Sequence, residues 1–177
     1  LFAFKQDGGQ VTSLSFRTDK AAQQFPFMAS SSADGRVHVW NLGTKSDVED
    51  MTSDSGDSDS DIEKEGNGAV IVNRKLQFTL EEAHRGEVSR VHFMHGEPIM
   101  VTAATDNCIK VWIFDAPDGS ARLLKSRDGH SGHPSKIRYY GGVTNSSMQD
   151  NATAESCEII SSGSDGTLRS FNTAIES

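Results

Sequence analysis

Cysteine, proline and long apolar segments are all scarce in this chain. Among its 177 residues, Cys108 and Cys157 are the only cysteines, and they lack the paired spacing of a zinc ribbon or a disulfide framework. Their scarcity favours a reducing, intracellular location over a secreted one. No apolar run approaches the length of a membrane-spanning helix, so we expect no membrane partner.

Helical periodicity is also lacking. Proline occurs four times and glycine 16 times, and short alternating segments are separated by turn residues. This pattern favours an all-β fold over an α/β fold. The chain begins at Leu1, inside a strand-like segment, and we interpret it as a piece of a longer protein.

Negative charge is confined to one segment. Residues 47–65 contain nine acidic residues and one basic residue, which accounts for the whole net charge of −8. The rest of the chain is neutral, which argues against a basic nucleic-acid clamp.

One short pattern occurs three times. An aspartate follows a small hydroxyl residue by four positions, directly precedes Gly or Asn, and precedes an aromatic residue by six positions. The copies are Ser30, Asp34, Gly35 and Trp40; Thr102, Asp106, Asn107 and Trp112; and Ser161, Asp165, Gly166 and Phe171. This spacing is typical of a strand, a tight turn and a second strand. Its repetition indicates a propeller or a similar array, and such arrays mostly bind partners.

The repeats divide the chain into three blades, each with four expected strands. We expect blades at residues 1–42, 76–114 and 115–177, an acidic, Ser-rich disordered insertion at 43–75, and a loop insertion at 142–156. The expected strands are 1–4, 11–16, 27–30 and 37–40; 76–80, 88–93, 99–102 and 109–112; and 122–125, 137–140, 158–161 and 168–171.

These features resemble the WD-repeat (WD40) β-propeller family. The resemblance is carried by His84, Val88, Phe93, Thr102, Asp106, Ile109 and Trp112, and again by Gly129, His130, Ile137, Tyr139, Ser161, Asp165, Leu168 and Phe171. In the first copy, Asp7 stands where the family has a histidine. The aspartate that usually follows the tryptophan is replaced by Asn41, Ile113 and Asn172. The resemblance implies about three four-stranded blades of a larger, tandem propeller.

Longer strings resemble the tandem-propeller WD-repeat family of the UTP-B subcomplex of the small-subunit processome. They include residues 107–115, with Trp-Ile-Phe-Asp, and 137–141, Ile-Arg-Tyr-Tyr-Gly. This resemblance implies a non-catalytic scaffold in pre-rRNA processing, located in the nucleus and nucleolus. The implied partners are other WD-repeat subunits of the subcomplex. Contact with the pre-rRNA and small nucleolar RNA ribonucleoprotein would be indirect.

A different WD scaffold, such as a substrate receptor of a ubiquitin ligase, is the alternative. Those receptors often carry Trp-Asp-x-Arg at the end of a blade, which Trp40 and Trp112 do not begin.

The combination of His84, Thr102 and Asp106 is similar to a nucleophilic triad. His130, Ser161 and Asp165 repeat it, however, and a catalytic set should occur once per site. We therefore interpret these residues, with Trp112 and Phe171 and with Ser30, Asp34 and Trp40, as structural networks. The sequence predicts no enzyme, no cofactor and no metal site.

Three further sets of residues were considered for a functional role. Ser58 and Ser60 each precede an acid by three positions, so phosphorylation by an acidophilic kinase and an unmodified linker both stay open.

Five aromatic residues at matched offsets are predicted to pack between blades: Phe2, Phe4, Phe16, Phe93 and Tyr139. Arg90, Arg138 and Tyr140 are surface candidates for contact with an RNA backbone, although no basic run supports that role.

Overall fold

The predicted all-β fold is confirmed. The computed structural model describes residues 2–3, 5–7, 9–19, 22, 26–42, 62–64, 70–72, 76–116, 119–140 and 158–172. These parts contain strands and no α-helix, and accordingly no helix that could cross a membrane. The strands are β1 (Phe2–Ala3), β2 (Val11–Phe16), β3 (Phe27–Ser32), β4 (Val37–Asn41), β5 (Ile62–Lys64), β6 (Val70–Val72), β7 (Leu76–Leu80), β8 (Val88–Phe93), β9 (Ile99–Ala104), β10 (Cys108–Ile113), β11 (Arg122–Asp128), β12 (Pro134–Tyr140), β13 (Glu158–Gly163) and β14 (Leu168–Asn172).

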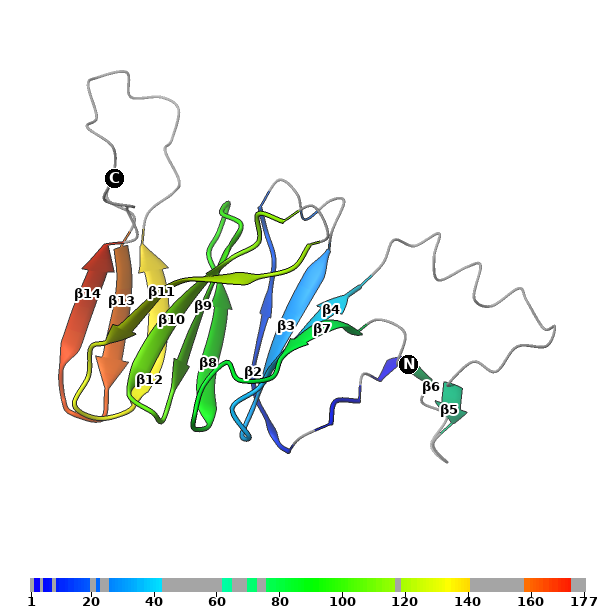
Figure 1. The fold of residues 1–177 in the computed structure, drawn as a ribbon, viewed down its shortest axis with the longest axis horizontal. Coiled ribbons are helices and arrows are strands. Elements are labelled where there is room, and N and C mark those ends of the chain that lie inside the picture. The colour runs from blue at the N-terminus through cyan, green and yellow to red at the C-terminus, as the bar shows by residue number, and fades with distance from the viewer. Residues whose placement is uncertain are drawn as a thin grey trace, which may run out of the picture.

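Three antiparallel sheets stand side by side (Figure 1). The first has the order β2-β3-β4-β7, the second β8-β9-β10-β11, and the third β12-β13-β14. A small fourth sheet, β1-β6-β5, pairs β1 with β6 in parallel. The inner strands β2, β8 and β12 of neighbouring sheets pack against one another.

The sheets are offset by one strand from the sequence copies. The strand β7 was expected to open the second copy, yet it pairs with β4 of the first sheet. Likewise, β11 was expected to open the third copy and pairs with β10 of the second. The third sheet therefore has three strands in the described parts of the chain. The spacing within one sequence copy does not reveal this pairing. The first strand of each later copy, β7 or β11, joins the sheet formed by the copy before it.

The two insertions fall largely outside the described residues. Within 43–75, which was expected to be disordered, residues 62–64 and 70–72 form β5 and β6. Ser58, Ser60 and the loop at 142–156 lie outside the described residues.

The same turn joins β3 to β4, β9 to β10 and β13 to β14. Gly35, Asn107 and Gly166 have φ values of 92°, 66° and 74°, in the left-handed region. Glycine enters this region without strain, and asparagine enters it more readily than other side chains. The residue directly after the repeated aspartate is therefore Gly or Asn because the turn demands a positive φ.

Two apolar layers hold the three sheets together. Between the first and second sheets, the Phe114 ring lies 5.2 Å from Phe93 and 6.3 Å from Phe27, measured between centroids. The Arg17 guanidinium lies over Phe27 and Phe114 and pairs with Asp19 at 2.7 Å. Between the second and third sheets, the layer contains Met94, Val101, Ile109, Val111, Ile137 and Ile159. Each large apolar side chain buried in this way contributes about 1.5–3 kcal/mol.

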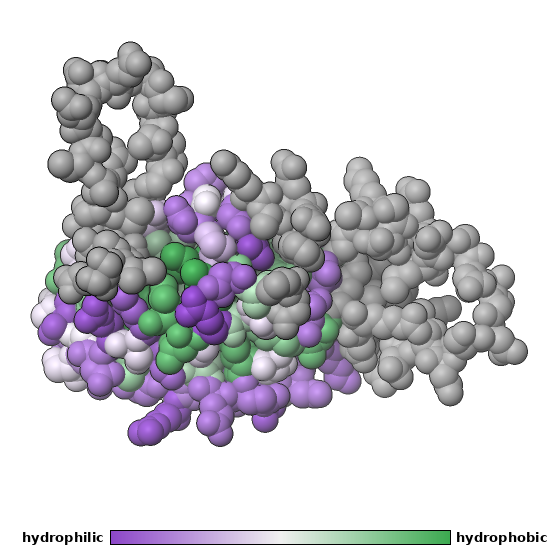
Figure 2. All heavy atoms as spheres, turned by 45° about the horizontal axis from the view of Figure 1, so that its top comes forward, coloured by the Kyte–Doolittle hydropathy of each residue, from purple (hydrophilic) through white to green (hydrophobic). Residues whose placement is uncertain are grey.

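Apolar side chains also remain on the outer faces of the described sheets. Phe16 was predicted to pack between blades, and that prediction is wrong here: it is 55% exposed. Phe93 and Tyr139, which occupy the equivalent positions in the second and third sheets, do pack in the apolar layers. No described sheet covers the β2 face that carries Phe16. Leu168 on β14 is 77% exposed at the opposite end. Figure 2 shows a hydrophobic patch between hydrophilic margins.

Candidate functional site: repeated hydrogen-bond networks

A buried chain of hydrogen bonds links the second sheet to the loop that precedes it. The indole Nε1 of Trp112 on β10 donates to the Thr102 hydroxyl on β9 at 3.0 Å. Thr102 Oγ1 lies 2.7 Å from His84 Nε2, and His84 Nδ1 lies 3.0 Å from an Asp106 carboxylate oxygen. The Asp106 carboxylate can only accept, so the neutral His84 carries its proton on Nδ1 and donates it to Asp106. His84 Nε2 is then an acceptor, and the Thr102 hydroxyl donates to it.

The charges in this network follow from burial and from the hydrogen bonds. Burial lowers the pKa of His84 below its ordinary value, outweighing the attraction of Asp106. Burial acts to raise the pKa of Asp106, but His84 and the backbone N–H groups of Arg85 and Cys108 outweigh it, and the pKa is lowered. The pair is therefore a neutral imidazole beside a carboxylate.

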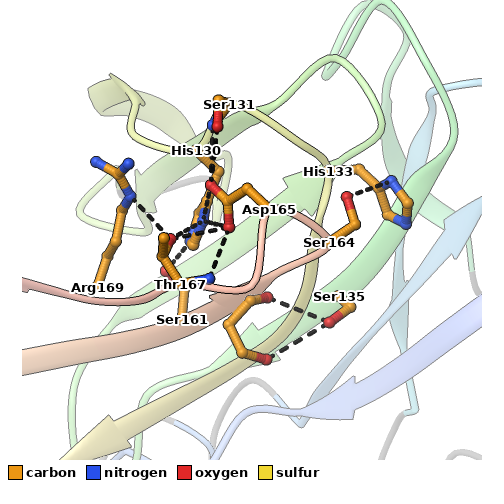
Figure 3. Close-up of polar contacts among 10 residues, drawn as sticks. His130, Ser131, His133, Ser135, Ser161, Ser164, Asp165, Thr167 and Arg169 are labelled. Atoms are coloured by element: carbon orange, nitrogen blue, oxygen red, sulfur yellow. Dashed lines mark hydrogen bonds and ion pairs between the residues drawn. The ribbon is translucent and has the colours of Figure 1, made fainter.

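The third sheet repeats the network without the indole (Figure 3). His130 Nε2 lies 2.7 Å from Ser161 Oγ, and His130 Nδ1 lies 3.1 Å from the Asp165 carboxylate. Asp165 also accepts from the backbone N–H groups of Ser131 and Thr167, each at 3.0 Å. These bonds hold the pKa of Asp165 well below its ordinary value, although burial acts to raise it. Phe171, where the second sheet has tryptophan, has no N–H to donate.

The first sheet uses a different side chain in place of histidine. Trp40 Nε1 donates to Ser30 Oγ at 2.8 Å, and Ser30 Oγ donates to Gln6 Oε1 at 2.6 Å. The sequence analysis placed Asp7 at the position of the histidine, and that prediction is wrong. Asp7 is exposed, whereas Gln6 is half-buried. The amide oxygen of glutamine supplies the acceptor that the imidazole nitrogen supplies elsewhere. Asp34 does not reach this network.

All three aspartates nevertheless share one contact. Asp34, Asp106 and Asp165 each accept the backbone N–H two residues further on, at 3.1, 3.1 and 3.0 Å. The side chain thus stabilises the left-handed turn that follows it. Asp34 also forms an ion pair with Arg36 at 3.6 Å, whereas Asp106 and Asp165 also hold a histidine.

The candidate triads are poorly placed for catalysis. The His84 and His130 side chains have no exposed surface, and Thr102 is 0% exposed. A nucleophile must reach its substrate, whereas the Thr102 hydroxyl is enclosed between His84 and Trp112. In the described parts of the chain, no group of His, Cys, Asp and Glu is arranged to hold a metal ion.

Sequence reasoning missed a set of hydroxyl groups at bulges in the inner strands, two of which bond to the neighbouring sheet. A bulge at the same register position of each inner strand carries Thr12, Ser89 or Ser135. Thr12 Oγ1 donates to the Val88 carbonyl of the next sheet, and Ser89 Oγ donates to the Pro134 carbonyl at 2.8 Å. A hydroxyl residue two positions before an apolar residue of each inner strand (Leu14, Val91 or Ile137) is the signal that could have found them.

The fold and the repeated networks define a WD-type β-propeller blade. A family model for the WD domain, G-beta repeat, matches residues 2–41 and 74–112. The crystal structure of Saccharomyces cerevisiae Sqt1 shares the fold, with a TM-score of 0.58 and 11% identity over 94% of this chain and 32% of that chain. The chain therefore contains WD40 repeats, folded as blades of a propeller.

Three longer proteins are similar in sequence. Human WD repeat-containing protein 36 is 35% identical over 176 residues, 99% of this chain. The U3 small nucleolar RNA-associated protein 21 homolog of Schizosaccharomyces pombe is 37% identical over 141 residues, 80% of this chain. The U3 small nucleolar RNA-associated protein 21 of Saccharomyces cerevisiae is 32% identical over 114 residues, 58% of this chain. This chain spans 15%, 12% and 11% of these proteins, respectively.

Proposed function

We infer that this chain is part of a non-catalytic scaffold subunit that acts in small ribosomal subunit biogenesis. Its place would be the small-subunit processome of the nucleolus, where the pre-rRNA is processed. The observation that carries this inference is the similarity to two proteins named as U3 small nucleolar RNA-associated, at 37% and 32% identity.

The geometry supports a scaffold over an enzyme. The residues that could have formed a triad are enclosed, and they recur in neighbouring sheets. Their hydrogen bonds fix turns and loops at the ends of the strands, which makes the sheet faces rigid. Rigid sheets with exposed loops are suited to binding several proteins at once.

The partners of such a scaffold would be other WD-repeat subunits of the same assembly. Contact with the pre-rRNA and small nucleolar RNA ribonucleoprotein could then pass through these proteins. Affinity purification of the tagged full-length protein from nuclear extract, with and without ribonuclease, tests this arrangement. We expect processome WD-repeat subunits in both samples, because protein contacts survive the nuclease. Recovery of ubiquitin-ligase subunits in their place would overturn the assignment.

A further inference from the structure

A basic hollow lies between the inner strands of the three sheets. It has a volume of about 220 Å3 and is bordered by β2, β8 and β12. The charged or ionisable side chains that line it come from two sheets: Arg90 and His92 from β8, and Lys136 and Arg138 from β12. The first sheet contributes the uncharged residues Ser13 and Leu14.

Strand register arranges these side chains in two layers. Arg90 and Lys136 each precede the buried apolar residue of their strand, and His92 and Arg138 each follow it. Residues two positions apart on a strand point to the same face, about 6.6 Å apart. The hollow therefore presents cationic groups at two successive levels along the strands.

No carboxylate neutralises this charge in the described parts of the chain. The Arg90 guanidinium donates to the Ser89 carbonyl at 3.2 Å, and the Arg138 guanidinium donates to the Ile137 carbonyl at 2.9 Å. Both arginines retain further N–H donors for a ligand. Burial lowers the pKa of His92, and the nearby Arg138 charge lowers it further, so at neutral pH the positive charge of the hollow comes from Arg90, Lys136 and Arg138.

We propose that this hollow binds phosphate groups of a single-stranded RNA backbone. Lysine and arginine contact phosphates without reading bases, and the lining residues include no Phe, Tyr or Trp on which bases could stack, which agrees with sequence-independent binding. Two levels of positive charge match a ligand whose phosphates repeat along a chain better than a peptide with a single phosphate. The choice of RNA also rests on the proposed function. It adds a direct RNA contact to the scaffold role.

The test uses the full-length protein and a fluorescent oligouridylate of about 16 nucleotides. Lys136→Gln/Arg138→Gln removes two exposed charges from the hollow, and Arg85→Gln/Arg127→Gln removes two exposed charges elsewhere. We expect the hollow variant to bind about tenfold more weakly. The slope of log K against log salt should become shallower by about 1.4, since each phosphate contact on a single strand contributes about 0.7. Adding Arg90→Gln should weaken binding further.

Three results would overturn the proposal. One is full-length protein that does not bind the oligouridylate at all. Another is an equal loss in the hollow and control variants, which would indicate diffuse electrostatics. The third is a phosphoserine peptide that binds more tightly than the RNA and depends on the same lysine and arginines. Co-purification with processome subunits should persist in the hollow variant, so failure of this site and failure of the proposed function are distinguishable.

Discussion

Asp106 shows how much one side chain does in this fold. It accepts hydrogen bonds from His84 Nδ1–H and from the backbone N–H groups of Arg85 and Cys108, at 3.0–3.1 Å. These contacts fix both the turn between β9 and β10 and the loop before β8. A carboxylate in this position stabilises two segments that are far apart in the sequence.

Removing the Asp106 carboxylate should make local opening of the second sheet easier. We expect Asp106→Ala to lower the free energy of local opening by about 1–3 kcal/mol, because buried donors lose their acceptor. Hydrogen exchange of the β9 and β10 amides in the full-length protein measures this. Asp115→Ala is the matched control, since Asp115 pairs with Arg122 on the surface and its removal should have a much smaller effect. Unchanged exchange in Asp106→Ala would show that the network is not structural.

The same network predicts a dependence of stability on pH. Unfolded histidine binds a proton below about pH 6.5, whereas folded His84 stays neutral to lower pH, because burial lowers its pKa. The unfolded state then binds more protons, so stability is lost as the pH falls from about 6.5 towards the folded pKa. The lowered pKa of Asp106 adds a loss below about pH 3.9, as the pH falls through its folded value.

His84→Gln isolates the histidine contribution. Glutamine fills the equivalent place in the first sheet, where Gln6 contacts Ser30. We expect this variant to be less stable at neutral pH and to lose part of the slope that begins as the pH falls below about 6.5. The rest of the slope should persist in this variant, because the pKa values of His38 and His92 are also lowered. Hydrogen exchange corrected for intrinsic rates measures the slope, and a slope equal to that of the unaltered protein would contradict the assignment.

Among the structural elements, the turn after each repeated aspartate is the most constrained. Asn107 has a φ of 66°, where the other two sheets have glycine. Asn107→Gly should therefore be tolerated, whereas Asn107→Val should cost about 1–2 kcal/mol, because a β-branched side chain is strained in the left-handed region. Hydrogen exchange of the Cys108 amide reports on the turn. Equal protection in the two variants would count against the predicted strain.

The bulge hydroxyls make a separate prediction about contact between sheets. Ser89→Ala removes a bond to the Pro134 carbonyl and should cost about 1 kcal/mol, with faster exchange in β12. Ser135 bonds within its own sheet, to the Ser162 carbonyl at 3.2 Å, so Ser135→Ala should leave β8 unchanged. Faster exchange confined to β8 in Ser89→Ala would contradict a role between sheets.

At the scale of the whole molecule, the sequence predicts local features well and pairing between distant segments poorly. The turn, the strands and the residues of two networks follow from spacing within each copy. Gln6 was missed because its amide replaces an imidazole of different shape. The offset of β7 and β11 was missed because the pairing crosses a copy boundary. The sequence analysis named Arg90 and Arg138 as candidates for contact with an RNA backbone, but it did not bring them together with Lys136 in one hollow, because they come from different sheets and no basic run marks them.

The charge distribution is equally uneven at this scale. Residues 47–65 carry the whole net charge of −8, whereas the hollow on the inner strands is positive. A neutral total for the remaining residues therefore hides a local basic surface. A neutral total argues against an extended basic clamp. It does not exclude a small basic site built from the side chains of neighbouring sheets.

The central claim, a role in making the small ribosomal subunit, is tested most directly by depleting the full-length protein and measuring ribosomal subunits on a sucrose gradient. The account predicts a selective loss of small subunits while large subunits persist, with recovery on re-expression of the unaltered protein. Asp106→Ala should restore small subunits less well than the unaltered protein. Undiminished small subunits after complete depletion, or a selective loss of large subunits, would contradict it.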